Sequence, residues 1–398
     1  NKTFSQDTIS KQDVPQRELF DYLKSKKKRE EADRKTAEKP IAHKTFYGLI
    51  PAVASNPTSG FIYGIAGNVS RYLGDAETTR ISSVSLVATL TTRSQLFLNA
   101  RSYIFSKNDE WVLQGDWRYQ ITNQPTYGLG TGTNEDEKSL IVFDFARFHQ
   151  TFLRKTAKNL YLGVGVHYDC WHNIRDELAE QRLADNNPNL TPFFSYNLVN
   201  NFYNRQATAT ALSANFVYDS RDNAINPYRG SFFTFNYRHA FQALGGSSNY
   251  GQVYAEARHF IKLHPQKPRI LGFWAFTQLI TSGRAPYMML PALGWDMYGG
   301  SGRGFPQGRF RGEEMIYLET EYRQNISRNG LLGFVVFANT TSISSRMNEI
   351  GFLQNFDVGG GLGLRVKLNK SSRTNIAFDY GIGTQGSSGF FINVTEAF

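Results

Sequence analysis

Apolar and polar side chains alternate along most of this chain, and this alternation predicts β-strands. Between residues 315 and 326 one face holds Ile316, Leu318, Thr320 and Tyr322, and the other holds Glu319, Glu321 and Arg323. Successive side chains of a strand point to opposite faces. A strand with one apolar and one charged face is typical of a barrel wall between lipid and a polar lumen.

From residue 46 onward the pattern predicts about sixteen strands joined by turns, with no convincing helix. The predicted spans are 46–54, 61–72, 79–92, 94–105, 110–122, 138–150, 158–172, 207–219, 230–242, 249–263, 269–282, 313–325, 330–342, 358–369, 373–384 and 389–398. Bacterial single-chain barrels have an even number of strands. We therefore predict an all-β fold, a transmembrane antiparallel β-barrel over residues 46–398.

The predicted connections alternate between short and long, as in membrane barrels with brief periplasmic turns and longer outer loops. With the N-terminus inside, the short turns are 106–109, 151–157, 326–329 and 370–372. The long loops on the outer side are 123–137, 173–206, 283–312 and 343–357. This parity favours a membrane barrel over a soluble β-sandwich.

Residues 1–45 differ from the rest because they carry dense charge and little to bury. They predict a solvated helix or disordered tail on the periplasmic side, or else a docking helix or plug. No signal peptide stands at the start, so for an exported protein the numbering must begin after a cleaved one.

Composition narrows the class of protein further. Only 40% of residues are hydrophobic and no run reaches 18 apolar residues, which excludes a helical membrane protein. The single cysteine, Cys170, excludes an intramolecular disulfide. The net charge of +10 fits anionic lipid or an anionic solute, whereas the scattered basic residues show no nucleic-acid motif.

The glycine-rich stretch 299–312 predicts a loop that folds back into the lumen. Arg303 lies between glycines, which permit a tight turn close to the wall. A guanidinium inside a barrel needs a carboxylate partner. The stretch resembles the inward-folded loop of the BamA/TamA/FhaC superfamily of outer-membrane barrels (the bacterial surface antigen family), whose mark is Arg-Gly-Phe or Arg-Gly-Tyr, here Arg303-Gly304-Phe305.

The resemblance implies partners for Arg303 on the two strands that follow the loop. Relatives pair this arginine with a glutamate and an aspartate. Glu321 matches the glutamate, but Asn339 stands where the aspartate is expected. One anionic partner is therefore missing, and Glu319 is the candidate to replace it.

Two further features resemble the same family. An inner turn of the form Asp-x-Arg-Asp-Asn-x-x-x-Pro-x-x-Gly includes Asp219, Arg221, Asp222, Asn226, Pro227 and Gly230. We interpret it as a structural hairpin end, because its acidic and amide side chains can cap backbone amides. The terminal aromatic Phe398 matches the signal by which such barrels are recognised for insertion, although Glu396 stands where an apolar residue is usual.

No enzyme motif is found: there is no Gly-x-Ser-x-Gly, no His-Glu-x-x-His and no phosphate loop. His167, Asp169 and His172 fall in one predicted strand and could suggest an acid–base or metal site. Polar residues of a lumen explain them at least as well. We predict no enzyme activity and no catalytic, cofactor-binding or metal-binding residue.

The resemblance implies an outer-membrane pore or translocation barrel, here a member without the POTRA domains of most relatives. The alternative is an assembly or insertion factor for outer-membrane proteins that acts with partner subunits. A structural or adhesive protein, suggested by the loop 173–206, is a third class. Expected partners are outer-membrane lipids, the barrel-insertion machinery, and either further copies of the chain or other assembly subunits, with no nucleic acid.

Overall fold

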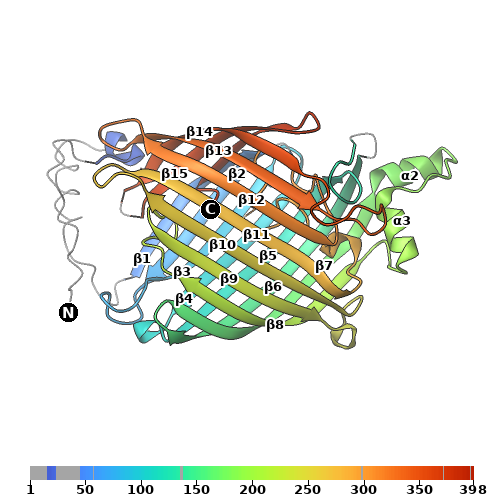
Figure 1. Cartoon of the computed structure of the whole chain (residues 1–398), viewed down its shortest axis with the longest axis horizontal. Coiled ribbons are helices and arrows are strands. Elements are labelled where there is room, and N and C mark those ends of the chain that lie inside the picture. Colours follow the sequence, from blue (N-terminus) through green and yellow to red (C-terminus); the bar gives the residue numbers. More distant parts are fainter. Residues whose placement is uncertain are drawn as a thin grey trace.

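In the described part of the chain, sixteen antiparallel strands form a closed barrel (Figure 1), which confirms the predicted fold class. The structure is a computed structural model that describes residues 16–23, 45–56, 58–134, 138–296, 299–370, 372–394 and 396–398. The strands are β1 (Thr45–Asn56), β2 (Gly60–Arg71), β3 (Ser82–Thr91), β4 (Leu96–Phe105), β5 (Trp111–Thr126), β6 (Ser139–Ala157), β7 (Leu160–Asp176), β8 (Ala207–Asp219), β9 (Gly230–Ala240), β10 (Tyr250–Lys262), β11 (Arg269–Gly283), β12 (Glu314–Asn325), β13 (Leu332–Ile343), β14 (Asp357–Asn369), β15 (Thr374–Gly383) and β16 (Ser388–Val394).

Two predicted boundaries are wrong in an informative way. β6 continues through the predicted turn 151–157, because its ladder with β7 runs without a break from Thr151 to Lys155 and ends at Ala157 after a register shift. β16 ends at Val394, although the pattern extended the last strand to residue 398. Each strand pairs with its neighbours in sequence, and β1 pairs with β16 to close the barrel.

Helices occur in the connections, so the prediction of none after residue 46 is wrong. Helix α2 (Glu177–Ala184) and helix α3 (Pro192–Val199) project from one end of the barrel (Figure 1). The capping residues were present in the sequence: Asp176 and Thr191 accept bonds from backbone amides at the two helix starts. Single-turn helices are η1 (Leu19–Leu23), η2 (Lys107–Asp109), η4 (Gln242–Leu244) and η5 (Tyr287–Met289).

The described part of the N-terminal segment lies against the short turns at the opposite end. The amide of Arg17 donates to the carbonyl of Asn329 (2.9 Å), and the amide of Lys370 donates to Glu18 (2.9 Å). Residues 1–15 and 24–44, where most of the predicted charged segment falls, lie outside the described residues. No helix among the described residues is long and apolar enough to cross a membrane.

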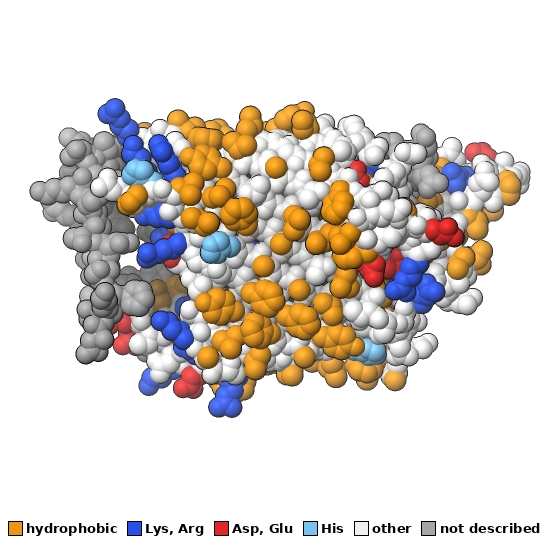
Figure 2. Space-filling view, in the orientation of Figure 1, with side chains coloured by type: hydrophobic (Ala, Val, Ile, Leu, Met, Phe, Trp, Pro, Cys, Tyr) orange, Lys and Arg blue, Asp and Glu red, His pale blue; other side chains and the backbone are white. Residues whose placement is uncertain are grey.

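On the face shown in Figure 2, apolar side chains cover the middle of the barrel, and basic side chains gather at the end opposite α2 and α3. Exposed apolar residues alternate with buried polar ones, as the sequence predicted. In β12, for example, Leu318 is 40% exposed, whereas Glu319 and Glu321 are buried in the lumen.

Buried side chains pack against one another inside the lumen in two clusters. One cluster of buried residues gathers around α3 and η5, and includes Phe145, Trp171, Phe193, Tyr196 and Tyr287. A second cluster of buried residues includes Trp274, Phe276, Phe305, Phe310 and Phe398. The loop 284–313 contributes to both clusters, so it runs inside the barrel as predicted.

Candidate functional site

The tip of the loop 284–313 lies against the barrel wall at Arg303. Gly302 and Gly304 have positive φ angles of +82° and +106°, which favour glycine. A Cβ at Gly304 would lie 2.7 Å from the carbonyl oxygen of Ile382. The glycines on both sides of Arg303 therefore allow the backbone approach that the sequence predicted.

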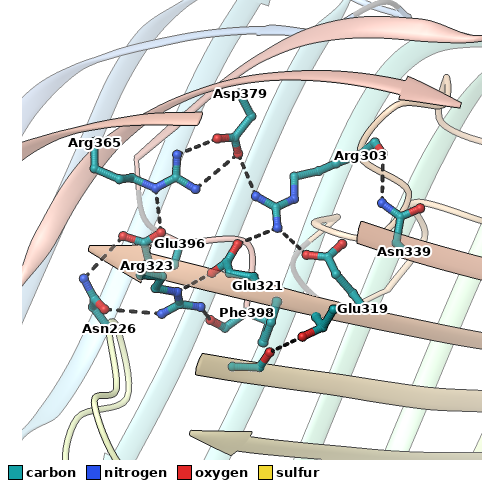
Figure 3. A network of polar contacts seen from close by, with 12 residues as sticks. Asn226, Arg303, Glu319, Glu321, Arg323, Asn339, Arg365, Asp379, Glu396 and Phe398 are labelled. Carbon is teal, nitrogen blue, oxygen red and sulfur yellow. Dashed lines mark hydrogen bonds and ion pairs between the residues drawn. The ribbon is translucent and has the colours of Figure 1, made fainter. Parts of the chain in front are cut away.

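The Arg303 guanidinium contacts three carboxylates (Figure 3). Nη1 donates to Asp379 (3.0 Å), and Nη2 donates to Glu321 (2.5 Å) and to Glu319. The side chain is 3% exposed and lies over the Phe337 ring, 3.8 Å from its centroid. A buried cation is tolerated when it is paired and hydrogen-bonded, and here two strands, β12 and β15, supply its three carboxylate partners. We call Arg303, Glu319, Glu321 and Asp379 the loop lock.

Both glutamates expected beside Arg303 are its partners, and Asn339 contributes in another way. Its side-chain amide donates to the carbonyl oxygen of Arg303 (2.9 Å). Asn339 therefore binds the backbone of the loop and does not pair with the guanidinium of Arg303. Glu319 is also fixed by Tyr317, whose hydroxyl donates to it and accepts from the amide of Gly302 (3.0 Å).

Asp379 on β15 was missed as a partner of Arg303. It also accepts from Arg365 of β14 (2.5 Å), and Arg365 donates in turn to Glu396 (2.7 Å). Alternation in β15 places Asn375, Ala377 and Asp379 on the lumen face. That alternation could have identified Asp379 as a lumen residue. Only closure of the barrel, however, brings Asp379 within reach of Arg303 in the loop.

The segment 396–398 turns into the lumen and joins the same network (Figure 3). Arg323 donates to Glu321 and to the carbonyl oxygen of Phe398 (2.7 Å). The Phe398 ring is 4% exposed and lies 5.3 Å from the Trp274 ring. Phe398 is therefore not a strand residue that faces lipid; its role in barrel insertion stays a prediction.

The inner turn 219–230 forms the predicted hairpin end. Asp219 pairs with Arg221 (2.9 Å), and Asp222 accepts from the amide of Tyr228 (2.9 Å). Pro227 is buried in the turn, and Gly230 has a φ of +103°. Asn226 points into the lumen, where its amide group contacts Arg323 (3.3 Å) and Glu396 (3.3 Å). The turn is thus linked to the loop lock through side chains.

The base of the loop is held by two more buried arginines. Arg309 donates to the carbonyl oxygen (2.5 Å) and the hydroxyl (2.8 Å) of Thr133. Arg311 donates to the carbonyl oxygen of Tyr287 (3.1 Å), and burial lowers its pKa to about 10. These contacts fix the loop at its base as well as at its tip.

Comparisons with known proteins agree with this geometry. Residues 146–398 match the sequence profile described as the Omp85 superfamily domain. BamA from Haemophilus ducreyi lacking POTRA domains 1–3 is similar in structure, with a TM-score of 0.55 and 16% identity, over 88% of this chain and 70% of that one. A comparison with curated protein sequences finds no match.

Two further solved structures share the fold. CdiB from Acinetobacter baumannii gives a TM-score of 0.53 at 14% identity, over 89% of this chain and 66% of that one. CdiB from Escherichia coli gives 0.56 at 10% identity, over 90% and 64%. The chain therefore spans about two thirds of the length of these structures.

Proposed function

Because the chain belongs to the Omp85 superfamily, we propose that it is a translocation barrel of the bacterial outer membrane whose lumen is closed at rest by the loop lock. The observation that carries this proposal is Arg303 held by carboxylates of β12 and β15. A loop fastened to two strands by buried charge is a closed gate. Its release would open a path past Phe305 and Phe310.

The loop lock suits a gate because its buried charges stabilise one another, and loss of any one of them destabilises the closed position of the loop. Truncating one partner of a buried ion pair leaves the others uncompensated and costs about 3–5 kcal/mol. A substrate or partner that withdrew Arg303 would therefore have to supply a comparable interaction. The loop would then stay shut until that ligand arrives.

The test is conductance in planar bilayers of the purified wild type beside Arg303→Ala. We expect a wild type that is mostly closed and a variant with larger, fluctuating conductance. Arg154→Ala is the matched control, because Arg154 is exposed on β6 over the Trp111 ring and has no place in the lock. A folded Arg303→Ala barrel that stays as silent as the wild type would contradict the gate.

A second candidate function is favoured by the seam between the first and last strands. Among the described residues, β1 and β16 share one residue pair, Ser55 with Ile392, whereas β1 and β2 share twelve. A short seam would open sideways more easily than any other pair of strands. Its free edges could then pair with a client strand, as expected of an insertion factor.

A disulfide across the seam separates the two functions. Ser55→Cys with Ile392→Cys joins directly paired positions, whose spacing suits a disulfide. Cys170→Ser is added to remove the native thiol. Under oxidising conditions, an insertion factor would lose insertion of a client barrel into liposomes, and dithiothreitol would restore it. Insertion that continues with the seam closed would exclude this candidate.

A further inference from the structure

Basic residues gather where β9 to β12 meet the short turns, at the end of the barrel opposite α2 and α3 (Figures 1 and 2). They are Arg229 just before β9, Lys267 in the turn between β10 and β11, Arg269 at the start of β11, and Arg328 in the turn after β12. We call these four residues the basic rim. The sequence predicts this end of the barrel to be periplasmic.

The strand register places Arg229 on the outer face of the wall. Gly230 pairs with Phe260, whose side chain is buried in the lumen. Because successive side chains of a strand point to opposite faces, the preceding Arg229 lies beside Ile261 on the outer face. Ile261 is 40% exposed, as expected of a residue that faces lipid.

Arg269 and Arg328 are also next to exposed apolar residues. The amide of Leu263 donates to the carbonyl oxygen of Arg269 (2.7 Å), so the two residues are neighbours across β10 and β11. Ile270 is buried in the lumen, which places Arg269 on the opposite, outer face. Ile326, which is 60% exposed, is two residues before Arg328.

None of the four cationic side chains of the basic rim has a hydrogen-bond or ion-pair partner within the part of the chain that the structure describes. The carboxylates of the adjoining turn 219–230 are already paired. Asp219 binds Arg221 (2.9 Å), and Asp222 binds Arg373 (2.8 Å). The rim therefore presents positive charge at the surface, and its counter-charge must come from another molecule or from outside the described residues.

The wall that adjoins the basic rim is apolar. Phe273 and Leu318 are 42% and 40% exposed on β11 and β12. In a membrane barrel such a surface faces acyl chains, so its border meets the lipid headgroups. Basic residues at this level attract anionic headgroups. We propose that the basic rim binds the headgroups of anionic phospholipids, with their acyl chains against the adjoining apolar wall.

An anionic phospholipid matches both parts of this surface. A zwitterionic phospholipid would cover the apolar wall but bring no net charge to the rim. An acidic peptide would pair with the rim but would not replace the acyl chains that cover the wall in a bilayer. Binding of the anionic lipid would hold this end of the barrel at the level of the headgroups.

The test is native mass spectrometry of the full chain in a neutral detergent, titrated with phosphatidylglycerol or with phosphatidylcholine of the same acyl chains. We expect phosphatidylglycerol to bind about fivefold more tightly or better, because each basic residue beside an anionic headgroup favours binding by about that factor. Raising the ammonium acetate concentration from about 0.1 M to 1 M should reduce this preference, since the screening length falls from about 10 Å to 3 Å.

A rim variant removes the three fully exposed charges without shortening their side chains much: Arg229→Gln, Lys267→Gln and Arg328→Gln. It should lose most of the preference for phosphatidylglycerol. The matched control removes three exposed arginines at the opposite end of the barrel: Arg205→Gln, Arg284→Gln and Arg346→Gln. The control should bind both lipids as the wild type does. Folding of each variant is checked by its heat-dependent shift in gel mobility.

Three results would each overturn the proposal. They are equal binding of the two lipids by the wild type, a wild-type preference in the folded rim variant, and an equal loss of preference in the control variant. Equal binding by the wild type would point instead to an acidic protein segment as the partner of the rim. Because lipid binding is measured directly, the outcome does not depend on whether the barrel conducts.

Discussion

Asn339 illustrates how a single residue changes the lock of this barrel. The resemblance to relatives places an aspartate at this position, as an acidic partner of Arg303. Here the asparagine donates to the carbonyl oxygen of Arg303 (2.9 Å), and the third carboxylate comes from Asp379 of β15. A loop fastened to β15 is tied close to the seam, since β15 neighbours β16.

Asn339→Asp should therefore destabilise this barrel, although it restores the residue expected from the relatives. The aspartate would lose the donated hydrogen bond and place a buried negative charge beside a carbonyl oxygen, at a cost of about 1–3 kcal/mol. Urea unfolding followed by gel mobility at neutral pH measures the difference. The stability of Asn339→Ala, which loses only the hydrogen bond, should lie between those of the wild type and Asn339→Asp. A variant more stable than the wild type would mean that Arg303 re-pairs with the new carboxylate.

Glu396, beyond the end of β16, makes stability depend on pH. Burial would raise its pKa, but Arg365 and then Arg323 outweigh burial and lower the pKa below the ordinary value of 4.5. A carboxyl whose pKa is lower in the folded state stabilises the fold above its unfolded pKa and loses this effect as pH falls. The stabilising effect is therefore present at neutral pH and disappears as the pH falls below 4.5.

Glu396→Gln tests this dependence, because glutamine keeps the shape but cannot ionise. The wild type should be more stable than the variant at pH 7, and the gap should narrow as the pH falls below 4.5. Thermal unfolding of both proteins across that range gives the comparison. A gap that is constant with pH would show that the charge of Glu396 does not stabilise the fold.

Among the elements, α2 and α3 depend on one carboxylate at the end of β7. Asp176 caps α2 by accepting from the amide of Ala179 (3.1 Å). It also accepts from the hydroxyl of Thr191 (2.5 Å), which caps α3, and from the hydroxyl of Ser139 on β6. One side chain thus fixes both helix starts to the barrel rim.

Asp176→Ala should loosen this pair of helices without unfolding the barrel. Loss of an N-cap costs about 1 kcal/mol, or roughly a fivefold rise in the open population. Trypsin cleavage after the half-buried Arg182 of α2 should accelerate by at least that factor, while the thermal midpoint of the barrel changes little. Asp176→Asn, which keeps one acceptor oxygen, should be intermediate. Unchanged cleavage would show that packing of Phe193 and Tyr196 of α3 against Tyr287 of the loop is sufficient to hold the helices.

At the scale of the whole molecule, strand pairing is uneven around the barrel. Within the part of the chain that the structure describes, β6 and β7 share fifteen residue pairs, whereas the seam of β1 and β16 has one. Local opening is easiest where few backbone hydrogen bonds must break. The barrel should therefore open first at the seam, whichever function it has.

Hydrogen exchange in nanodiscs should reveal this order. Amides of β1 and β16 should exchange well before those of β6 and β7, by at least tenfold in rate. The seam disulfide between positions 55 and 392 should slow exchange in β1 and β16 and leave β6 and β7 unchanged. Uniform exchange around the barrel would contradict a weak seam and weaken the case for an insertion factor.

The sequence alone determined the architecture, because alternation with a period of two is a local property of strands. It identified the barrel, the apolar and polar faces of β12, the inward loop and the two glutamates beside Arg303. It also pointed to a family, which the match over residues 146–398 confirms. Local patterns failed where local rules are ambiguous. The capped helices after Asp176, for example, were not predicted.

Only the tertiary structure decided what meets inside the lumen. Asp379 lies 76 residues from Arg303 in the chain, and Glu396 reaches Asn226 across 170 residues. Such contacts depend on closure of the barrel and on where the last residues turn inward, which no periodicity encodes.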